Sequence, residues 1–282
     1  MVDIAFHCDE EKNFSTGYSV HAFTYVDYSI PMHNHAFYEL NIVMSGTGIH
    51  SIENCSFRVK CGDVFVIPPM VAHAYTDTKD LEVYHILFQK KFFEKNRDEA
   101  TKVSGFLHLT EIEPFLRGNF SNNFYLHLSQ IQLLQLKNEL SFLDDNGPFS
   151  WEEYSLMKYH TVWKILYWFS GLLNQNLHST HSSIDRYELQ IIDSLEYIHK
   201  NYGEKISIES LCQKTFLSRS TFLRSFKRVC SISPTEYLNR YRCKKAIEQL
   251  ECHNYSKTEV AHNCGFYDLS HMDRILKKYE IT

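Results

Sequence analysis

The chain has 282 residues, with 29 Lys and Arg against 34 Asp and Glu and a formal net charge of −5. This length is typical of two domains, and 44% hydrophobic with 22% charged residues describes a folded globular protein and excludes a disordered one. Taken as a single value, the negative charge argues against nucleic acid as a partner.

Secretion and membrane insertion are also disfavoured. The first ten residues are polar and acidic, without the basic segment and apolar run of a secretory signal. The most apolar stretch, residues 165–173, is far shorter than the roughly 20 residues of a membrane span. The eight cysteines include no C-x-x-C pair and no zinc-finger spacing. We therefore expect a cytoplasmic protein with reduced thiols and no membrane partner.

Short β-branched and aromatic runs fill the first 90 residues. They cover residues 19–26, 40–44, 62–67 and 81–88, and Gly and Pro residues separate them. Many short strands with such turns predict a β-sandwich or a β-barrel.

Histidines and one glutamate are regularly spaced in this half. His33 and His35 alternate along an expected strand and so face the same side, and Glu39, an even number of residues further on, can share it. His73 would arrive from another strand. Three imidazoles and a carboxylate suit a divalent Zn, Ni, Mn or Fe ion.

Helical periodicity begins near Phe92. One helix is expected over 124–143, with Leu126, Leu133, Leu136, Leu140 and Leu143 on one side, and a second over 151–177. Residues 178–183 are polar and are typical of a linker, and the chain after them is expected to be helical.

The last hundred residues contain two predicted helix starts and an internal repeat. Ser233 with Glu236, and Ser256 with Glu259, form capping boxes. Positions 207–212 match 256–261, and 224–227 match 274–277, at spacings of 49 and 50 residues. Each copy predicts a short helix, a tight turn (216–217 or 265–266) and a second helix, which is the pattern of a helix-turn-helix motif.

The charge of this segment is positive. Residues 211–250 hold nine basic and two acidic side chains. A solvated helix face is the ordinary explanation of such a run, but together with the repeat it favours phosphate neutralisation. Residues 184–282 carry +3 and residues 1–183 carry −8, so the overall −5 averages an acidic half and a basic half.

Residues 207–279 resemble the tandem helix-turn-helix domain of AraC/XylS-family transcription regulators, and the His33/His35/Glu39 and Gly62/Pro68/His73 blocks resemble the two cupin motifs. Asp27, Met70 and Asp77 depart from those motifs. The residues carrying the first resemblance include Leu211, Leu217, Ser218, Arg219, Ser220, Phe222, Arg224, Phe226, Ser233, Pro234, Gly265, Phe266, Ser270 and Arg274. The resemblance implies an α+β chain with a cupin-like barrel over 1–90, a helical dimerisation region over 91–178, a linker over 179–186 and an all-α tandem helix-turn-helix domain over 187–282.

In that family the second helix of each unit reads the major groove. The implied DNA-binding residues are Arg219, Ser220, Thr221, Leu223, Arg224 and Lys227 in the first unit, and Ser270, His271, Asp273, Arg274 and Lys277 in the second. Arg224 is the best candidate for bidentate bonding to guanine, with a phosphate contact as the alternative. Phe222 and Phe226 are expected in the core. Asp273 would be repelled by phosphate but could accept from a cytosine amine, so the second unit is expected to be weaker.

The resemblance also implies a small-molecule effector in the barrel, often a sugar. The candidate effector-binding residues are His33, His35, Tyr38, Glu39, His73, Tyr75, Tyr18 and His85, with His21 as a further candidate. The resemblance requires no cofactor. A divalent metal (Zn, Ni, Mn or Fe) on His33, His35, Glu39 and His73 is the alternative, and satisfied structural residues at the barrel mouth are a third.

These expectations combine into one functional hypothesis. The chain is expected to be a sequence-specific DNA-binding transcription regulator, not an enzyme, controlled by a sugar or sugar derivative. Its expected partners are double-stranded DNA, a second copy of the chain and RNA polymerase, although the leucine stripe of 124–143 could instead pack on the chain's own barrel. The competing hypothesis is a metal-dependent cupin enzyme with an accessory helical module, which would not need the tandem repeat or the basic segment.

Overall fold

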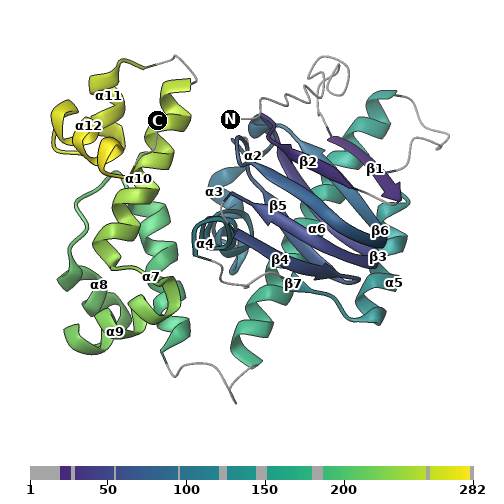
Figure 1. The fold of residues 1–282 in the computed structure, drawn as a ribbon, viewed down its shortest axis with the longest axis horizontal. Coiled ribbons are helices and arrows are strands. Elements are labelled where there is room, and N and C mark those ends of the chain that lie inside the picture. The colour runs from purple at the N-terminus through teal and green to yellow at the C-terminus, as the bar shows by residue number, and fades with distance from the viewer. Residues whose placement is uncertain are drawn as a thin grey trace. The chain divides into compact units, whose positions relative to one another are not determined.

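The chain divides into two compact units, Met1–Ser179 and Thr180–Thr282, and each is described by itself. The computed structural model describes residues 20–26, 29–53, 55–94, 96–120, 126–143, 151–179, 187–251 and 255–279 (Figure 1). In these ranges, no helix combines the length and apolarity that a bilayer crossing requires.

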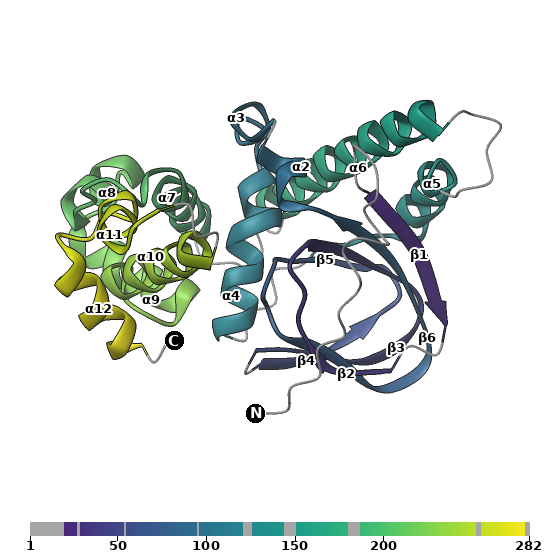
Figure 2. The same cartoon turned by 90° about the horizontal axis from the view of Figure 1, so that it is seen from above.

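A seven-stranded antiparallel sheet forms the centre of the N-terminal unit and curls into a barrel (Figure 2). Its strands are β1 (Val20–Val26), β2 (Ile30–His33), β3 (Tyr38–Ile52), β4 (Cys55–Lys60), β5 (Asp63–Ile67), β6 (His73–Phe88) and β7 (Leu126–His127). Strand β6 pairs with β1, β2 and β3, and β3 also pairs with β4 and β5. The long strands β3 and β6 bend at register shifts between Val43 and Ile49. Gly46 permits this bend, because its φ is +71° and a Cβ there would collide with the Asp80 carbonyl.

Alternation along β3 separates two environments. Leu40 and Ile42 pack with the helices in one hydrophobic core, whereas Val43 packs with Phe65 and Tyr75 inside the barrel. The inward face also carries polar residues, because Glu39 and Asn41 alternate with Leu40 and Ile42. The barrel therefore has an apolar outer contact with the helices and a partly polar interior.

Helices cover the outer face of the sheet. They are α2 (Lys90–Glu94), α3 (Arg97–Ala100), the π-helical turn η1 (His108–Ile112), α4 (Glu113–Phe120), α5 (Gln130–Leu140) and α6 (Trp151–Ser179). Phe92 stacks on Trp163 with a centroid separation of 5.0 Å, and both rings belong to the core shared by sheet and helices. The regions expected as a barrel and as a separate helical region thus share one core.

The helix expected over 124–143 is shorter in the structure. Leu126 and His127 pair with Val64 and Asp63 as strand β7, and α5 begins only after Ser129. Ser129 and Gln132 form a reciprocal capping box that fixes this start. Leu133, Leu136 and Leu140 are buried in the core of their own unit. The leucine stripe therefore packs on the chain's own barrel, which was the alternative to pairing between copies.

The C-terminal unit contains the two expected helix-turn-helix elements. Its helices are α7 (Glu188–Asn201), α8 (Ile208–Thr215), α9 (Arg219–Cys230), α10 (Pro234–Glu251), α11 (Lys257–Asn263) and α12 (Leu269–Lys278), with α10 running between the two elements (Figure 1). The turns lie where the repeat predicts them. Phe216 and Gly265 have φ values of +56° and +76°, and Leu217 N–H and Phe266 N–H close each turn on the carbonyls of Cys212 and Ala261.

One of the two predicted capping boxes differs in detail. The Ser256 and Glu259 box is complete. At the other, Ser233 Oγ accepts from Glu236 N–H at 3.2 Å, but the Glu236 carboxylate accepts from the Arg240 guanidinium. Arg240 lies one turn further along the helix, where its charge competes for the carboxylate.

Burial of the α5 stripe leads to a stability prediction. We expect Leu136→Ala to lower the free energy of unfolding by about 2–5 kcal/mol, because its fully buried side chain would leave a cavity. Lys137→Ala, on the exposed side of the same helix, should change it by less than about 0.5 kcal/mol. Urea unfolding followed by tryptophan fluorescence measures this unit, because all three tryptophans lie in α6. Equal effects of the two variants would contradict the observed packing.

Candidate nucleic-acid interface and effector site

The second helix of the first helix-turn-helix, α9, has one buried and one exposed face. Phe222 and Phe226 are fully buried, as expected from the sequence. Ser220, Arg224 and Lys227 are exposed, and Thr221 and Leu223 are half-buried. Ser218 caps the helix by accepting from Thr221 N–H at 3.3 Å.

The equivalent helix of the second element, α12, repeats this arrangement. Met272 and Ile275 are buried and hold the helix on its core. Ser270, Arg274 and Lys277 are exposed, as is Asp273. They follow Ser220, Arg224 and Lys227 by 50 residues each. The two helices therefore expose the same Ser, Arg and Lys pattern, and they differ where Thr221 and Leu223 correspond to His271 and Asp273.

Several of the expected DNA-binding residues make intramolecular contacts, among them Arg219 and His271. Arg219 forms an ion pair with Glu209 of α8, and both side chains are largely exposed. Because an exposed pair of this kind contributes little stability, DNA phosphate can compete for the guanidinium. His271 Nδ1 accepts from Tyr267 N–H at 3.2 Å, so its ring supports the turn before α12. Tyr267, Asp268, Ser270, His271 and Arg274 line an open surface hollow of about 410 Å³.

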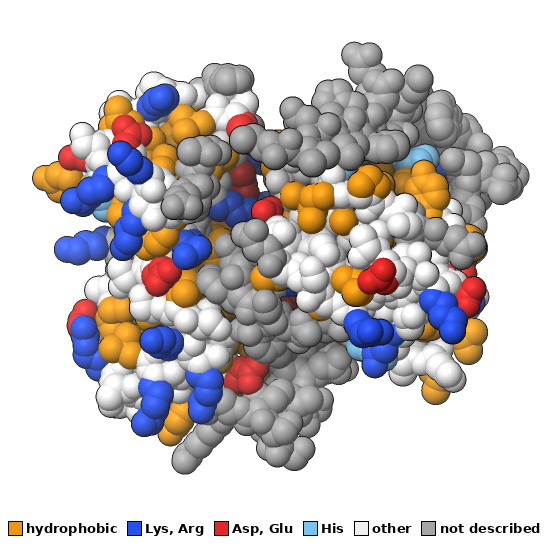
Figure 3. All heavy atoms as spheres, viewed as in Figure 1, with side chains coloured by type: hydrophobic (Ala, Val, Ile, Leu, Met, Phe, Trp, Pro, Cys, Tyr) orange, Lys and Arg blue, Asp and Glu red, His pale blue; other side chains and the backbone are white. Residues whose placement is uncertain are grey.

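The sequence count of basic residues overstates the charge available to DNA. Arg242 is buried, and its guanidinium donates to the carbonyls of Tyr202 and Glu204, both at 2.7 Å. Burial lowers the pKa of this guanidinium. Arg240 is engaged with Glu236, and Lys245 with Glu248. The Lys and Arg side chains that remain on the surface are spread over both helix-turn-helix elements on the face in Figure 3.

Inside the barrel, Glu39 contacts three histidines: His35, which lies between β2 and β3, and His73 and His85, both on β6. Glu39 Oε2 lies 2.8 Å from His35 Nε2 and 3.3 Å from His73 Nε2, and Oε1 contacts His85 Nδ1. All four side chains are buried. Burial alone would raise the pKa of the Glu39 carboxyl, but the three imidazoles hold that pKa well below its usual range. Glu39 is therefore a carboxylate.

Three histidines of this cluster are oriented by backbone carbonyls. The Nδ1 atoms of His33, His35 and His73 lie 3.0 Å from Pro31 O, 2.8 Å from Phe37 O and 3.2 Å from Val71 O. A ring nitrogen that faces a carbonyl carries its proton, which leaves the lone pair of a neutral ring on Nε2. The His33 and His73 ring centroids are 4.2 Å apart. Burial and then His73 lower the pKa of His33 to about 4, so this ring is neutral at pH 7.

Part of the cluster has ligand atoms spaced closely enough to hold a metal ion. Ligand atoms of His35, Glu39 and His73 all lie within 4.8 Å of one another. The His33 ring lies beside that of His73, but its nitrogens are not among the atoms that meet this spacing. The arrangement can therefore hold a divalent ion or accept the hydroxyl groups of a small molecule.

The remaining effector candidates lie in three different places. Tyr75 faces the barrel interior, where its hydroxyl accepts from Asn41 Nδ2 at 3.1 Å. Tyr38 lies on the opposite face of β3 from Glu39, stacked on Phe88 among the residues that contact the helices. Its position beside Glu39 in the sequence places it on the other side of the pleat. His21 is on β1, and Tyr18 lies outside the described residues.

Three buried polar residues of the barrel, Asn41, His50 and Arg117, were not identified from the sequence. Asn41 could have been found by alternation, since it follows Glu39 by two. His50 was hidden because the register shifts of β3 change which residues face inward. Arg117 lies on α4, where Glu113 four residues earlier in an apolar segment was the available signal.

Comparisons with known proteins agree with both halves of the chain. A family model described as AraC-like ligand binding domain matches residues 16–122, and one described as Helix-turn-helix domain matches residues 211–280. The HTH-type transcriptional activator RhaS of Pectobacterium carotovorum subsp. carotovorum is 26% identical over 254 residues, covering 89% of this chain and 84% of the relative. RhaS of Enterobacter sp. (strain 638) is 24% identical over 251 residues, covering 89% of this chain and 84% of that relative.

Two solved structures are also similar to this chain. ToxT from Vibrio cholerae O395 is 10% identical, with 92% of this chain and 93% of that chain covered and a TM-score of 0.37. The DNA-binding domain of AdpA, crystallised with a target DNA, is 26% identical, with 32% of this chain and 80% of that chain covered and a TM-score of 0.31.

Proposed function

Because this chain belongs to the AraC/XylS family of DNA-binding, effector-regulated transcription regulators, we propose that α9 and α12 read its promoter DNA and that a small polyhydroxylated effector binds in its barrel. The role is sensing rather than catalysis. The effector acts by binding two conformations unequally and so shifting their populations.

The observation that carries this proposal is the duplicated exposed pattern on the two reading helices. Ser220, Arg224 and Lys227 recur as Ser270, Arg274 and Lys277, each set exposed on a helix held by buried residues. An arginine at this position can bond guanine in bidentate fashion, and the lysines neutralise phosphate. Since Leu223 is replaced by Asp273 in the second element, the two helices prefer different bases beside the shared guanine.

Arg224 provides the direct test. DNA sites are first selected from a random library with the wild-type protein. We expect Arg224→Ala to lose discrimination at one base pair of the selected site by about 1–3 kcal/mol, because a bidentate contact to one base is removed. Binding to the selected site and its single-base variants, measured by fluorescence anisotropy, gives this value.

Lys227→Ala is the matched control on the same helix. It should weaken binding to all sequences alike and lower the slope of log affinity against log salt by about 1, as expected for a phosphate contact. If Arg224→Ala behaves like Lys227→Ala, the arginine contacts phosphate and the proposed base reading is wrong.

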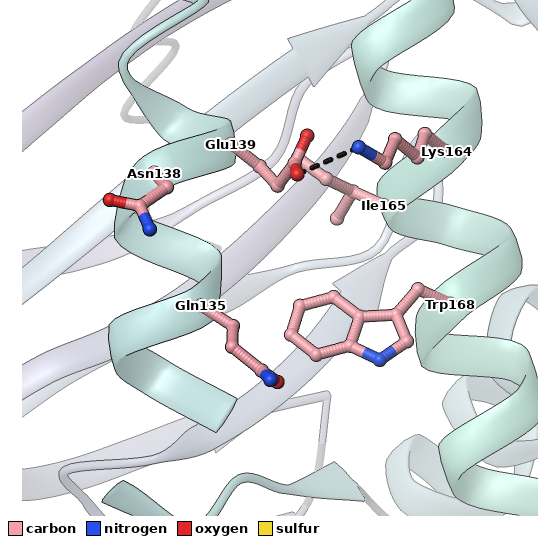
Figure 4. Close-up of a pocket in the computed structure, with 6 residues that line it drawn as sticks. All are labelled: Gln135, Asn138, Glu139, Lys164, Ile165 and Trp168. Atoms are coloured by element: carbon pink, nitrogen blue, oxygen red, sulfur yellow. Dashed lines mark hydrogen bonds and ion pairs between the residues drawn. The ribbon is translucent and has the colours of Figure 1, made fainter. Parts of the chain in front are cut away.

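We also propose that the protein forms a homodimer through the exposed side of α5. Ile131 and Leu134 are three residues apart on the side of the helix opposite the buried leucines, and they are 70% and 64% exposed. Beside them, Gln135, Asn138 and Glu139 face Lys164, Ile165 and Trp168 of α6 across a groove of about 380 Å³ (Figure 4). Two large apolar side chains next to a groove fit a second copy of the same helix.

Introducing negative charge on this apolar surface tests the dimer. We expect the double variant Ile131→Glu, Leu134→Glu to sediment as a monomer at concentrations where the wild type is a dimer, because the exposed apolar surface is the proposed contact. Leu156→Glu, at an exposed leucine of α6, is the control and should leave the dimer intact. Analytical ultracentrifugation that finds a wild-type monomer, or dissociation only with Leu156→Glu, would contradict the interface.

A divalent metal in the barrel is the second candidate, and the orientation of the histidines favours it. His35 and His73 direct Nδ1 at carbonyls, which leaves their Nε2 atoms, 2.8 and 3.3 Å from Glu39 Oε2, as the ligand atoms for an ion. His33, His35 and His73 with the Glu39 carboxylate form a donor set that Zn, Ni, Mn or Fe accepts. Such an ion would supply a Lewis-acidic contact for effector hydroxyls.

Elemental analysis tests the metal. We expect a stoichiometric content of one of these metals in protein purified without chelators, and its loss in His35→Ala, because a ligand is removed. His127→Ala removes a histidine that lies outside the cluster and pairs with Asp63, and it should retain the metal. Wild-type protein that stays metal-free after incubation with each ion would exclude the site. Contact with RNA polymerase and a cytoplasmic location remain predictions of the regulator function.

A further inference from the structure

His50 occupies an unusual position inside the barrel. Its ring is stacked between Phe65 and Tyr75 at centroid distances of 4.7 and 4.6 Å, and Phe57 meets it edge-on at 5.2 Å. The side chain is fully buried, yet neither ring nitrogen has a hydrogen-bond partner among the described residues. Burial and the nearby Arg117 hold the pKa of His50 well below its ordinary value. The neutral ring therefore presents one unused donor and one unused acceptor.

Arg117 brings a second unused donor to the same aromatic rings. It extends from α4, which lies against β4 and β5 (Figure 2). Its guanidinium carbon lies 4.9 Å from the Phe65 centroid and 5.7 Å from that of Phe57. Nε donates to Glu113 at 2.7 Å and Nη2 donates to Val66 O at 2.6 Å, whereas Nη1 has no partner in the described part of the chain.

Asn41 completes the group from strand β3. Its Nδ2 donates to the Tyr75 hydroxyl at 3.1 Å, and Tyr75 is the ring on which His50 stacks. Asn41 Oδ1 is buried and lacks a partner within the described residues. Native proteins rarely leave such buried groups unpaired, and a cluster of them is typical of a site that binds a polar molecule.

We propose that Asn41, His50 and Arg117 form the inner wall of the effector site and bind neighbouring hydroxyl groups of a neutral, polyhydroxylated ligand. The unused donors are Arg117 Nη1 and one His50 nitrogen, and the unused acceptors are Asn41 Oδ1 and the other His50 nitrogen. A hydroxyl group both donates and accepts, so adjacent hydroxyls match this mixture. This inference rests on the proposed effector function of the barrel.

The charges in the barrel select a neutral ligand over an acidic one. The Arg117 guanidinium is already paired with the Glu113 carboxylate, which is itself buried. Glu39 contributes a further negative charge inside the barrel. A ligand carboxylate would add another anion beside Arg117, whose guanidinium is already paired, and an unpaired buried charge is costly. Neutral sugars and polyols add no charge to the barrel.

The inner wall also connects the ligand to a helix. Arg117 lies on α4, which directly follows the π-helical turn η1 along the chain. Such turns are frequent at functional sites. A ligand bonded to Arg117 on α4 and to Asn41 on β3 would hold the helix against the sheet. Ligand binding should therefore slow amide hydrogen exchange in α4, so that the effect of the ligand extends from the barrel to a helix outside it.

The test is isothermal titration calorimetry on the full chain with two sets of probes. The neutral set is L-arabinose, D-xylose, L-fucose, D-galactose and D-mannitol, and the acidic set is D-galacturonate and D-gluconate. We expect a neutral probe to bind the wild type and its acidic counterpart to bind at least about tenfold more weakly. An acidic probe that binds as tightly, or no binding by any neutral probe, overturns the proposed ligand class.

Two variants then test the residues themselves. His50→Phe keeps an aromatic ring between Phe65 and Tyr75 but removes both nitrogens, and Arg117→Lys keeps the charge but removes Nη1. Each should weaken binding of the neutral probe by about tenfold, while His50→Phe leaves the melting temperature unchanged or higher. His160→Phe, at an exposed position of α6, is the control and should bind like the wild type. A probe that binds His50→Phe as tightly as the wild type overturns the inner wall.

Calorimetry on the variants tests the inner wall, and binding of selected DNA tests the regulator function, so each can fail without the other. If a sugar binds equally to wild type, His50→Phe and Arg117→Lys, the barrel remains an effector site with other contacts. If selected DNA is not bound, the regulator function fails whatever the calorimetry gives. Should Arg117→Lys fail to fold, His50→Phe and Asn41→Leu decide the assignment.

Discussion

The pairing of β3 with β6 is the constraint on which the N-terminal unit depends. Leu40 is opposite Ile86 and Asn41 is opposite His85, and before the register shifts of β3 its even positions face the helices and its odd positions face inward. A slip of one residue would place Leu40 in the barrel and Glu39 in the apolar core. The same register that buries the hydrophobic core therefore brings the Glu39 carboxylate to the histidines.

Local patterns predicted part of this site, and long-range packing determined the rest. Alternation along one strand predicted that His33, His35 and Glu39 share a face, but they come together differently: β2 ends at His33, His35 lies between the strands and Glu39 is on β3. The same rule places Tyr38 on the opposite face, so its inclusion with the effector residues neglected the pleat. Arg117 reaches the barrel interior from a helix that follows the sheet, and His50 faces inward only after the register shifts of β3. No local pattern encodes either arrangement.

The DNA-binding unit was more predictable because its determinants are local. Capping residues, a left-handed turn and buried side chains on the second helix all act within one helix-turn-helix, and they recur about 50 residues later with Met272 in the place of Phe222. The charge was predicted less well, because counting residues cannot distinguish an exposed arginine from a buried one. Arg242 contributes to the count but holds the loop after α7 through two carbonyls. These bonds hold α10 to the loop after α7 and keep the guanidinium from DNA phosphate.

The barrel interior links recognition to a change in stability. Glu39, Asn41 and His50 lie on the same strand and extend inward, while Arg117 and the histidines of β2 and β6 surround them from other segments. Buried groups without partners make the ligand-free arrangement less favourable than it would be with an apolar interior. A ligand that satisfies them recovers this free energy only in the conformation that brings β3, β6 and α4 together. It therefore favours that conformation over any in which α4 has moved away, and this difference in affinity is what effector control requires.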